Sequence, residues 1–308
     1  MSQPAKRKRV PVHGVLLLDK PEGISSTQAL AKVKWLLNAE KAGHGGTLDP
    51  LASGLLPIAL GEATKTVSYA MDGRKVYRFT ACWGEERTTD DLEGLVSATS
   101  DKRPSREEIE PMLPRFTGEI MQAPPAFSAI KVDGERAYDL ARAGEAVELA
   151  ERPILIEALK LVDIPDRDHA IFEVTCGKGT YVRVLAEDIA HKLGTVGHVS
   201  LLRRERVAPF ESAQMVDLAT VEECARQGLP LALVGLSEAV AHLPLVRLDE
   251  AGARRICQGQ EVVVPGLAPP MDQVLRLEDA AARFLGLGRV AGVGRIAAKR
   301  LVRQGSHE

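Results

Sequence analysis

The sequence has few cysteines, and none stands in a redox or metal-binding pattern. Its four cysteines, at positions 82, 176, 224 and 257, are far apart and include no C-x-x-C pair. A disulfide framework and a zinc site are therefore not expected, and this usage fits a reducing compartment. No stretch of the 308 residues is apolar for long enough to span a membrane, and the basic run at 6–9 precedes only a short apolar run, unlike a secretory signal. We expect a cytoplasmic protein.

Cofactor signatures and a global charge signal are missing as well. The chain carries no dinucleotide-binding glycine fingerprint, no P-loop and no cluster of metal ligands, so we expect neither a cofactor nor a metal. The net charge is −2, so any nucleic-acid surface must be a local patch. From residue 247 to the end there are ten Lys/Arg and seven Asp/Glu, against 30 and 35 in the rest of the chain. This segregation favours a terminal module that contacts RNA.

What is present indicates a large core and two domains. We expect a disordered basic tail at 1–10, a main domain at 11–243 and a small domain at 244–308, with the boundary at Leu243-Pro244. Apolar runs and capping residues predict strands at 14–21, 75–83, 152–164, 169–176 and 198–207, and a terminal hairpin or small barrel at 284–302. Helices are expected at 28–38, 62–71, 105–113, 135–142, 180–193, 215–227 and 249–257, and a polar loop at 84–100.

The most informative stretch is the glycine-rich segment at residues 43–54, which contains Asp49-Pro50. Four glycines and a proline in twelve residues exclude a regular helix and give a loop whose backbone can closely approach a ligand. Pro50 directs Asp49 towards an extended conformation. A single acid on such a loop suits a nucleophile or an acid/base carboxylate. From these residues alone, the pattern favours an Asx-turn or helix-capping role for Asp49.

The string G-H-G-G-T-L-D-P-L-A at 43–52, together with G-K-G-T-Y-V-R at 177–183, closely resembles the motifs of the TruB family of tRNA pseudouridine synthases. The resemblance covers nearly the whole chain. It implies an α+β pseudouridine synthase fold, with a mixed, largely antiparallel sheet flanked by helices and a small C-terminal PUA-like β-barrel that binds RNA. In that family the aspartate of the first motif is the essential acid, which here is Asp49.

The same resemblance implies roles for further residues. Tyr77 would stack on the flipped uracil and is a candidate for proton transfer at C5, and Arg183 would orient Asp49. Substrate contacts would come from His44, Tyr181 and Leu202. Residues two apart share a face in a strand, so Tyr181 and Arg183 could point into one pocket, but in a first helical turn they would diverge. Each of these residues also has an ordinary structural role as an alternative.

Basic positions that touch the RNA backbone in the family match Lys65, Lys131 and Arg142, with solvated surface charge as the alternative. Asp91 aligns with a family acid that pairs with groups of the catalytic site. Gly45 departs from the pattern, since threonine is frequent there, and removes a hydroxyl near Asp49.

The resemblance implies a tRNA pseudouridine(55) synthase, an isomerase that flips uridine 55 out of the T loop, cleaves N1–C1′ and joins C5 to C1′. Asp49 would either attack C1′ or abstract the 2′ hydrogen. The expected partner is tRNA, with no obligate protein partner and a monomeric state. Two other readings stay open: a noncatalytic RNA-binding protein that does not need Asp49, and a guide-RNA-dependent modifier of ribosomal RNA.

Overall fold

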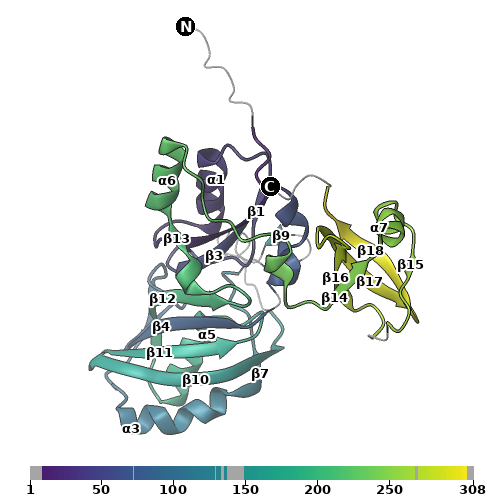
Figure 1. Cartoon of the computed structure of the whole chain (residues 1–308). Helices are drawn as coiled ribbons and strands as arrows, with labels where there is room; N and C mark the ends of the chain where they lie inside the picture. Colours follow the sequence, from purple (N-terminus) through teal and green to yellow (C-terminus); the bar gives the residue numbers. More distant parts are fainter. Residues whose placement is uncertain are drawn as a thin grey trace. The chain divides into compact units, whose positions relative to one another are not determined.

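The structure, a computed structural model, describes residues 9–71, 73–128, 130–132, 135–136, 149–267 and 270–303, with the backbone alone at 131–132 and 135–136. The chain divides into two compact units, each described here by itself (Figure 1). The first unit comprises 1–49, 54–72 and 208–308, and the second comprises 50–53 and 73–207. Residues 1–8 of the expected tail at 1–10 lie outside the described residues, and Val10 forms an isolated parallel bridge with Ala39.

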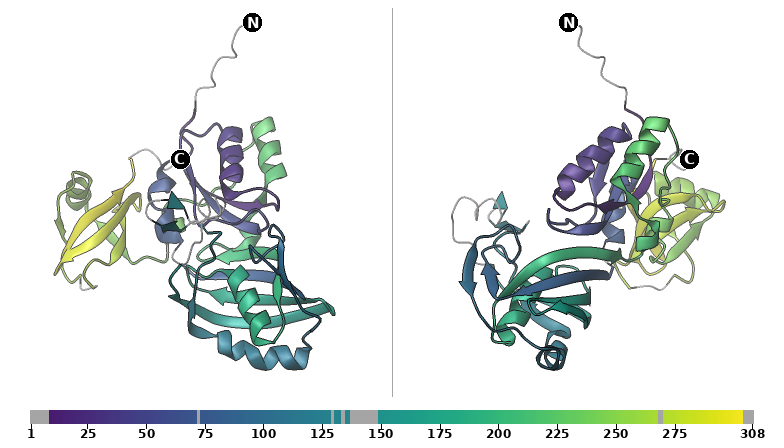
Figure 2. Two further views of the ribbon diagram at one scale, coloured as in Figure 1. Left: turned by 180° about the vertical axis from the view of Figure 1, so that it is seen from behind. Right: turned by 90° about the vertical axis from the view of Figure 1, so that its left-hand side faces the viewer.

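The second unit is built on five antiparallel strands. Their order is β12 (Gly197–Val207), β4 (Lys75–Trp83), β11 (His169–Cys176), β10 (Arg152–Asp166) and β7 (Gly118–Gln122). Every second residue of β11 is buried, the period expected of a strand with one face on a core. On that sheet Phe79 stacks on Phe172 with ring centroids 5.2 Å apart. Helix α5 (Val182–Lys192) packs on β12 and β4 and crosses one face of the sheet (Figure 2).

Two expectations for this unit are wrong. Residues 84–100 are not a plain loop, because β5 (Glu85–Arg87) and β6 (Val96–Thr99) pair as a hairpin. The expected helix at 135–142 is contradicted at its start, because β9 (Glu135–Arg136) pairs with β8 (Lys131–Val132). Residues 137–142 lie outside the described part. The expected helix at 105–113 starts as α3 (Arg106–Ile109) behind a Ser105 capping box and continues as a 3-10 turn, Glu110–Phe116.

In the first unit, β1 (Gly14–Lys20) pairs antiparallel with β3 (Ser53–Leu60) and parallel with β13 (Val216–Asp217), and β2 (Ala42–His44) pairs with β3. Helices α1 (Ser26–Leu36) and α6 (Leu218–Gln227) lie side by side in every view (Figures 1 and 2). Ser25 and Gln28 form the capping box of α1, and Asp217 caps α6 through the Thr220 amide. Among the described residues, no helix combines the length and apolarity needed to cross a bilayer.

The C-terminal part of this unit is a curled five-stranded sheet. Its order is β14 (Leu245–Leu248), β16 (Val274–Asp279), β17 (Phe284–Gly292), β18 (Arg295–Leu301) and β15 (Val262–Val263), and α7 (Glu250–Cys257) packs against it. The sheet and α7 enclose their own apolar core, formed by Val246, Leu248, Ile256, Val262, Leu275, Leu277, Leu285, Val290 and Ile296. The expected terminal hairpin is therefore confirmed as β17 and β18.

The end of β18 is tied to a segment far away in sequence, the 3-10 turn Gly61–Lys65. The Lys65 ammonium donates to the Leu301 carbonyl at 3.0 Å and pairs with the Glu62 carboxylate at 2.6 Å. The Arg303 amide donates to the same carboxylate at 2.8 Å. Burial of Glu62 opposes its ionisation, but these hydrogen bonds outweigh it, and its pKa lies below the ordinary value.

Candidate active site

The loop that carries Asp49 is anchored by one buried hydroxyl. Ser26, in the first turn of α1, accepts a hydrogen bond from the Leu48 amide at 2.8 Å and donates to the Leu48 carbonyl at 2.9 Å. Ser26 is 1% exposed and Leu48 is 4% exposed, so water does not compete for these bonds. They fix the backbone one residue before Asp49, whose side chain is half-buried.

The other end of the loop explains the glycine at position 45. The Gly45 amide donates to the Pro57 carbonyl at 2.8 Å, which holds this backbone against β3. A Cβ added at Gly45 would lie 2.6 Å from the Met71 sulfur. Glycine in place of the family's threonine at position 45 is therefore explained sterically, because Met71 occupies the volume that a threonine side chain would need. His44, at the end of β2 opposite Ile58, is half-buried.

In the second unit, β4 and β12 bring two predicted substrate contacts onto one face. Tyr77 lies opposite Arg204, and Phe79 lies opposite Leu202. Residues directly opposite each other in an antiparallel pair share a face, so Tyr77 and Leu202 are diagonal neighbours on it. Tyr77 is 9% exposed and Leu202 is 6% exposed, so both belong to the packed part of the sheet.

The two residues of the second motif diverge. Tyr181, not Thr180 as expected, is the N-cap residue of α5, and Arg183 lies in the first helical turn. The Gln122 side chain fixes Tyr181 from both sides, because its oxygen accepts from the Tyr181 amide at 2.8 Å and its nitrogen donates to the Tyr181 carbonyl at 3.1 Å. The Arg152 guanidinium lies 5.4 Å from the centroid of the Tyr181 ring, within cation–π range.

Arg183 is buried among oxygen atoms of the second unit. Its guanidinium donates to the Thr89 carbonyl at 2.7 Å and to the Phe127 carbonyl at 3.1 Å, and it lies 3.5 Å from the Asp91 carboxylate. Asp91 is itself held by the Thr89 hydroxyl at 2.6 Å and by the Glu93 amide at 3.0 Å. Both side chains of this ion pair are at least nine-tenths buried. The guanidinium therefore has a fixed position, since a buried charge that lost these partners would be strongly destabilising.

Two carboxyl groups near Arg183 were not singled out from the sequence. Burial raises the pKa of Asp90 to about 6, with Arg183 opposing the rise and Asp91 adding to it. Glu187 is four residues after Arg183 on α5, and burial together with the Asp90 charge raises its pKa to about 7. No pattern in the sequence marks either group, because their burial and their charged neighbours arise only when the chain folds.

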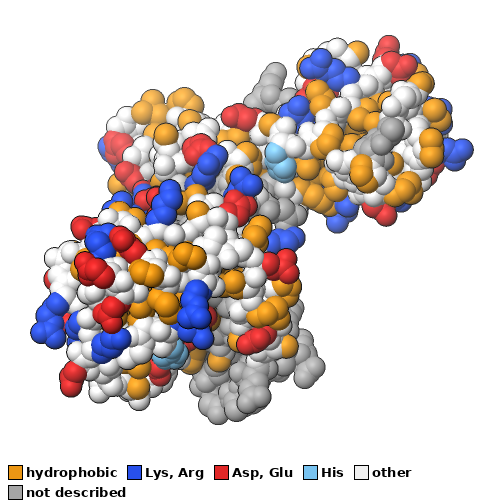
Figure 3. All heavy atoms as spheres, turned by 90° about the horizontal axis from the view of Figure 1, so that it is seen from below, with side chains coloured by type: hydrophobic (Ala, Val, Ile, Leu, Met, Phe, Trp, Pro, Cys, Tyr) orange, Lys and Arg blue, Asp and Glu red, His pale blue; other side chains and the backbone are white. Residues whose placement is uncertain are grey.

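Of the three residues predicted to contact the RNA backbone, the structure describes the side chain of Lys65 alone. Lys65 has the partners at Glu62 and Leu301 already described, and its side chain is 30% exposed. Lys131 has a backbone position in β8, and its side chain is outside the described part, as is the whole of Arg142. On the face drawn in Figure 3, basic and acidic side chains are interspersed with apolar ones. The roles given above to Asp49, Tyr77, Arg183, His44, Tyr181, Leu202 and the three basic residues all stay predictions.

Comparison with known proteins gives consistent matches along the chain. Residues 34–182 match the family described as "TruB family pseudouridylate synthase (N terminal domain)". Residues 183–232 match "tRNA pseudouridylate synthase B C-terminal domain", and residues 244–302 match "Pseudouridine synthase II TruB, C-terminal".

Curated relatives are similar over almost their whole length. The chain is 50% identical to "tRNA pseudouridine synthase B" of Brucella melitensis, covering 94% of this chain and 96% of the relative. It is 54% identical to the protein of the same name from Bradyrhizobium diazoefficiens, covering 96% of this chain and 87% of the relative.

Solved structures share the fold. "Structure of H/ACA RNP bound to a substrate RNA containing 2'-deoxyuridine" contains a chain that matches with a TM-score of 0.73 at 24% identity, over 96% of this chain and 87% of that one. "Crystal Structure of a Cbf5-Nop10-Gar1 Complex" matches with a TM-score of 0.70 at 28% identity, over 90% and 78%. The expected α+β fold with a PUA-like terminal sheet is thereby confirmed.

Proposed function

Because the chain belongs to the TruB family of pseudouridylate synthases, we propose that it converts uridine 55 in the T loop of tRNA to pseudouridine. The enzyme is an isomerase. The observation that carries the proposal is 50–54% identity to relatives named tRNA pseudouridine synthase B over at least 94% of this chain. The cytoplasm, where tRNA is matured, is its proposed place of action, and tRNA alone is its proposed partner.

The reaction moves one glycosidic bond and consumes no external reagent. The N1–C1′ bond breaks, the uracil turns, C5 bonds to C1′, and the proton lost from C5 is balanced by a proton gained at N1. We assign the first step to Asp49, whose loop is anchored through Leu48 to the Ser26 hydroxyl. A carboxylate on a fixed backbone keeps one direction of approach, which lowers the entropic part of the barrier.

Two routes are compatible with an aspartate in this role. In the first, Asp49 attacks C1′ and is later displaced by C5. In the second, it abstracts the 2′ proton while N1–C1′ breaks and the uracil leaves as its anion, which gives a glycal; C5 then bonds to C1′ and Asp49 returns the proton to C2′. Substrate deuterated at 2′ separates the routes, because only the second breaks the C2′–H bond and gives a primary isotope effect on kcat.

The remaining predicted residues would recognise the extruded nucleotide. Tyr77 supplies a base-stacking surface from β4, Leu202 extends the apolar part of that face, and His44 and Tyr181 contact the substrate. Arg183 holds a buried positive charge that would keep a neighbouring carboxylate ionised. Extrusion of a stacked base costs roughly a few kcal/mol, which phosphate contacts must offset. kcat/KM is therefore expected to fall with salt, mainly through KM.

Guide-RNA-dependent modification is the second candidate, since one solved neighbour is a chain of an H/ACA RNP bound to a substrate RNA. The two solved neighbours are 24–28% identical to this chain, about half the identity of the named tRNA enzymes. The test is incubation of the purified protein alone with unmodified tRNA carrying tritium at C5 of uridine. Release of one tritium per tRNA from position 55 is expected. Release that requires an added guide RNA or protein would contradict the proposal.

Asp49→Asn separates catalysis from RNA binding. The amide is nearly isosteric with the carboxylate but cannot act as nucleophile or base, so tritium release should cease while tRNA affinity stays within about threefold. Glu119→Asn, on the exposed side of β7, is the control and should keep full activity. If Asp49→Asn still formed pseudouridine, Asp49 would not be the catalytic acid, and the assignment of the first step to it would be wrong.

A further inference from the structure

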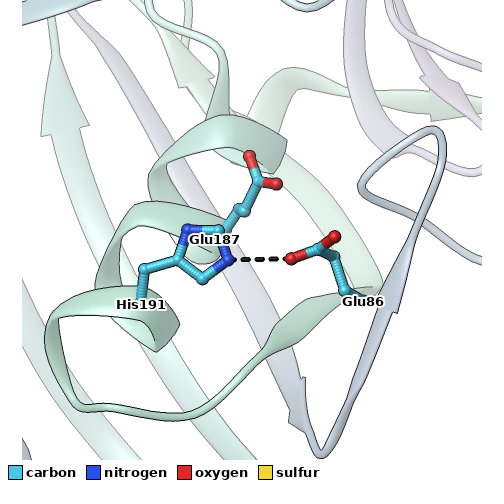
Figure 4. A group of neighbouring side chains, drawn as sticks. All are labelled: Glu86, Glu187 and His191. Carbon is cyan, nitrogen blue, oxygen red and sulfur yellow. Dashed lines mark hydrogen bonds and ion pairs between the residues drawn. The ribbon is translucent and has the colours of Figure 1, made fainter. Parts of the chain in front are cut away.

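A group of three metal-ligating side chains lies outside the residues assigned to pseudouridine formation. Glu187 and His191 are four residues apart on α5, the spacing that places two side chains on one helical face. Glu86 reaches towards them from β5 (Figure 4). One ligand atom from each residue lies within 4.8 Å of the others. The donor set is one imidazole and two carboxylates from two elements whose packing is fixed by the fold.

Two of the ligand atoms form a hydrogen bond and would have to separate by about 0.6 Å to share one ion. His191 Nε2 and Glu86 Oε2 are 2.8 Å apart. A tetrahedral zinc ion with bonds of about 2.1 Å holds its ligand atoms about 3.4 Å apart. The third carboxylate needs to approach by about 1–2 Å, which a side-chain rotation of a half-buried glutamate can supply.

The two carboxylates differ in their partners. Glu86 has hydrogen bonds from His191 at 2.8 Å and from the Ser97 hydroxyl at 2.9 Å. Glu187, in contrast, makes no hydrogen bond or ion pair with any residue that the structure describes. Its half-buried carboxylate can therefore turn towards the other two ligand atoms without losing a partner.

We propose that Glu86, Glu187 and His191 form a binding site for a divalent transition-metal ion of the zinc class. The mixed nitrogen and oxygen donors suit Zn²⁺ or Co²⁺ better than Mg²⁺, which prefers oxygen ligands in octahedral geometry. Three protein ligands leave one position for water, so the ion exchanges with solvent. The site is independent of the pseudouridine chemistry, which needs no metal. It lies one to two helical turns beyond Arg183, where a bound ion would fix α5 against the β5–β6 hairpin.

The test is titration of the full-length, chelator-treated protein with Co²⁺, followed by displacement with Zn²⁺. We expect one site per chain with the visible absorption of four- or five-coordinate Co²⁺. The near-ultraviolet thiolate band should be absent, which distinguishes this site from binding at the exposed Cys257. Glu187→Gln and His191→Gln should each weaken binding by more than about tenfold.

The chain supplies a matched control and a positive variant. His169 pairs with Asp166 at 2.8 Å, a second surface His–carboxylate pair in the same unit, so His169→Gln should leave the affinity unchanged. His191→Cys keeps a ligand in place and should bind Co²⁺ with a new thiolate band. Equal affinity in Glu187→Gln and wild type, the same loss in His169→Gln, or absence of the new band would each overturn the proposal. Circular dichroism at the assay temperature confirms that every variant is folded.

Discussion

The metal-free protein should lose stability as the pH rises past neutrality, because of Glu187. Its pKa in the folded chain is about 7, against 4.5 for the unperturbed group. The folded state therefore holds a proton that the unfolded state has already released, and stability falls as the pH rises from about 4.5 through about 7. Glu187→Gln removes this ionisation, so the variant should gain on the wild type across that window.

The shift corresponds to about 3 kcal/mol for a fully buried group, at 1.36 kcal/mol per pKa unit. Because Glu187 is half-buried, solvent screening reduces the expected gain to about 1–2 kcal/mol at pH 8. At roughly 2–4 °C per kcal/mol for a chain of this size, the Tm difference is several degrees at pH 8 and near zero at pH 4.5. Thermal melts in EDTA from pH 4.5 to 8.5 measure it. A Tm difference that stays constant with pH would refute the reasoning, and Glu119→Gln provides the exposed control.

Three further changes test the loop anchor, the terminal tie and one backbone constraint. Ser26→Ala leaves the Leu48 amide and carbonyl buried without their partner, so it should cost about 1–3 kcal/mol and lower kcat more than it raises KM; unchanged kcat would show that the anchor does not serve Asp49. Lys65→Met should reduce stability by about 1–3 kcal/mol because Glu62 loses a partner. The Lys65 ammonium has three N–H donors, and two of them bond to Glu62 and Leu301, which leaves one for a phosphate. The salt slope of log kcat/KM should therefore also fall by about one in this variant, and an unchanged slope would exclude a phosphate contact. Gly286→Ala should destabilise by more than about 2 kcal/mol, because its Cβ would lie 2.2 Å from the Arg300 carbonyl at φ +124°. Gly266→Ala, at φ +76° with no atom within 4 Å, should cost about 1 kcal/mol, and equal losses in chemical denaturation would rule out the clash.

Local signals in the sequence predicted much of the fold. Ser25 with Gln28 is a capping box that can be recognised without any tertiary information. The helix expected at 215–227 begins only at Leu218, behind the cap residue Asp217. Apolar runs in the sequence predicted the buried strands, and β11 shows the alternating burial that such a strand should have. The terminal hairpin followed from glycines between apolar segments.

The hairpin of β5 and β6 was missed because its strands are polar and largely half-exposed, so their sequence has no hydrophobic alternation. The pairing of β5 with β6 depends on a close approach between Gly94 and Thr89, which the sequence does not reveal. A Cβ on Gly94 would lie 2.5 Å from the Thr89 hydroxyl, so glycine is required where the hairpin turns back.

For the candidate site, too, the sequence identified some residues but not their surroundings. The motifs identified Asp49, Tyr77 and Arg183 as residues to consider. What surrounds Arg183 could not be foreseen, because the carbonyls of Thr89 and Phe127 come from segments 94 and 56 residues away. Backbone acceptors carry no residue signature, and the raised pKa values of Asp90 and Glu187 arise from burial that only the folded chain creates.

The tie between Lys65 and Leu301 has a consequence for the order in which the chain is made. Apart from residues 50–53, the second unit is continuous from 73 to 207, so it can close while the rest is still being synthesised. The first unit cannot, because β1 needs β13, and the turn at 61–65 needs residues 301–303. Nascent chains generally fold domain by domain as they emerge, and contacts of such long sequence separation form late. The edge of β1 that pairs with β13 therefore stays unpaired until Val216 has emerged. The Glu62 carboxylate lacks its hydrogen bond from the Arg303 amide until that residue is synthesised. Slow synthesis near the C-terminus would prolong the interval in which this half-built unit is vulnerable to aggregation and proteolysis.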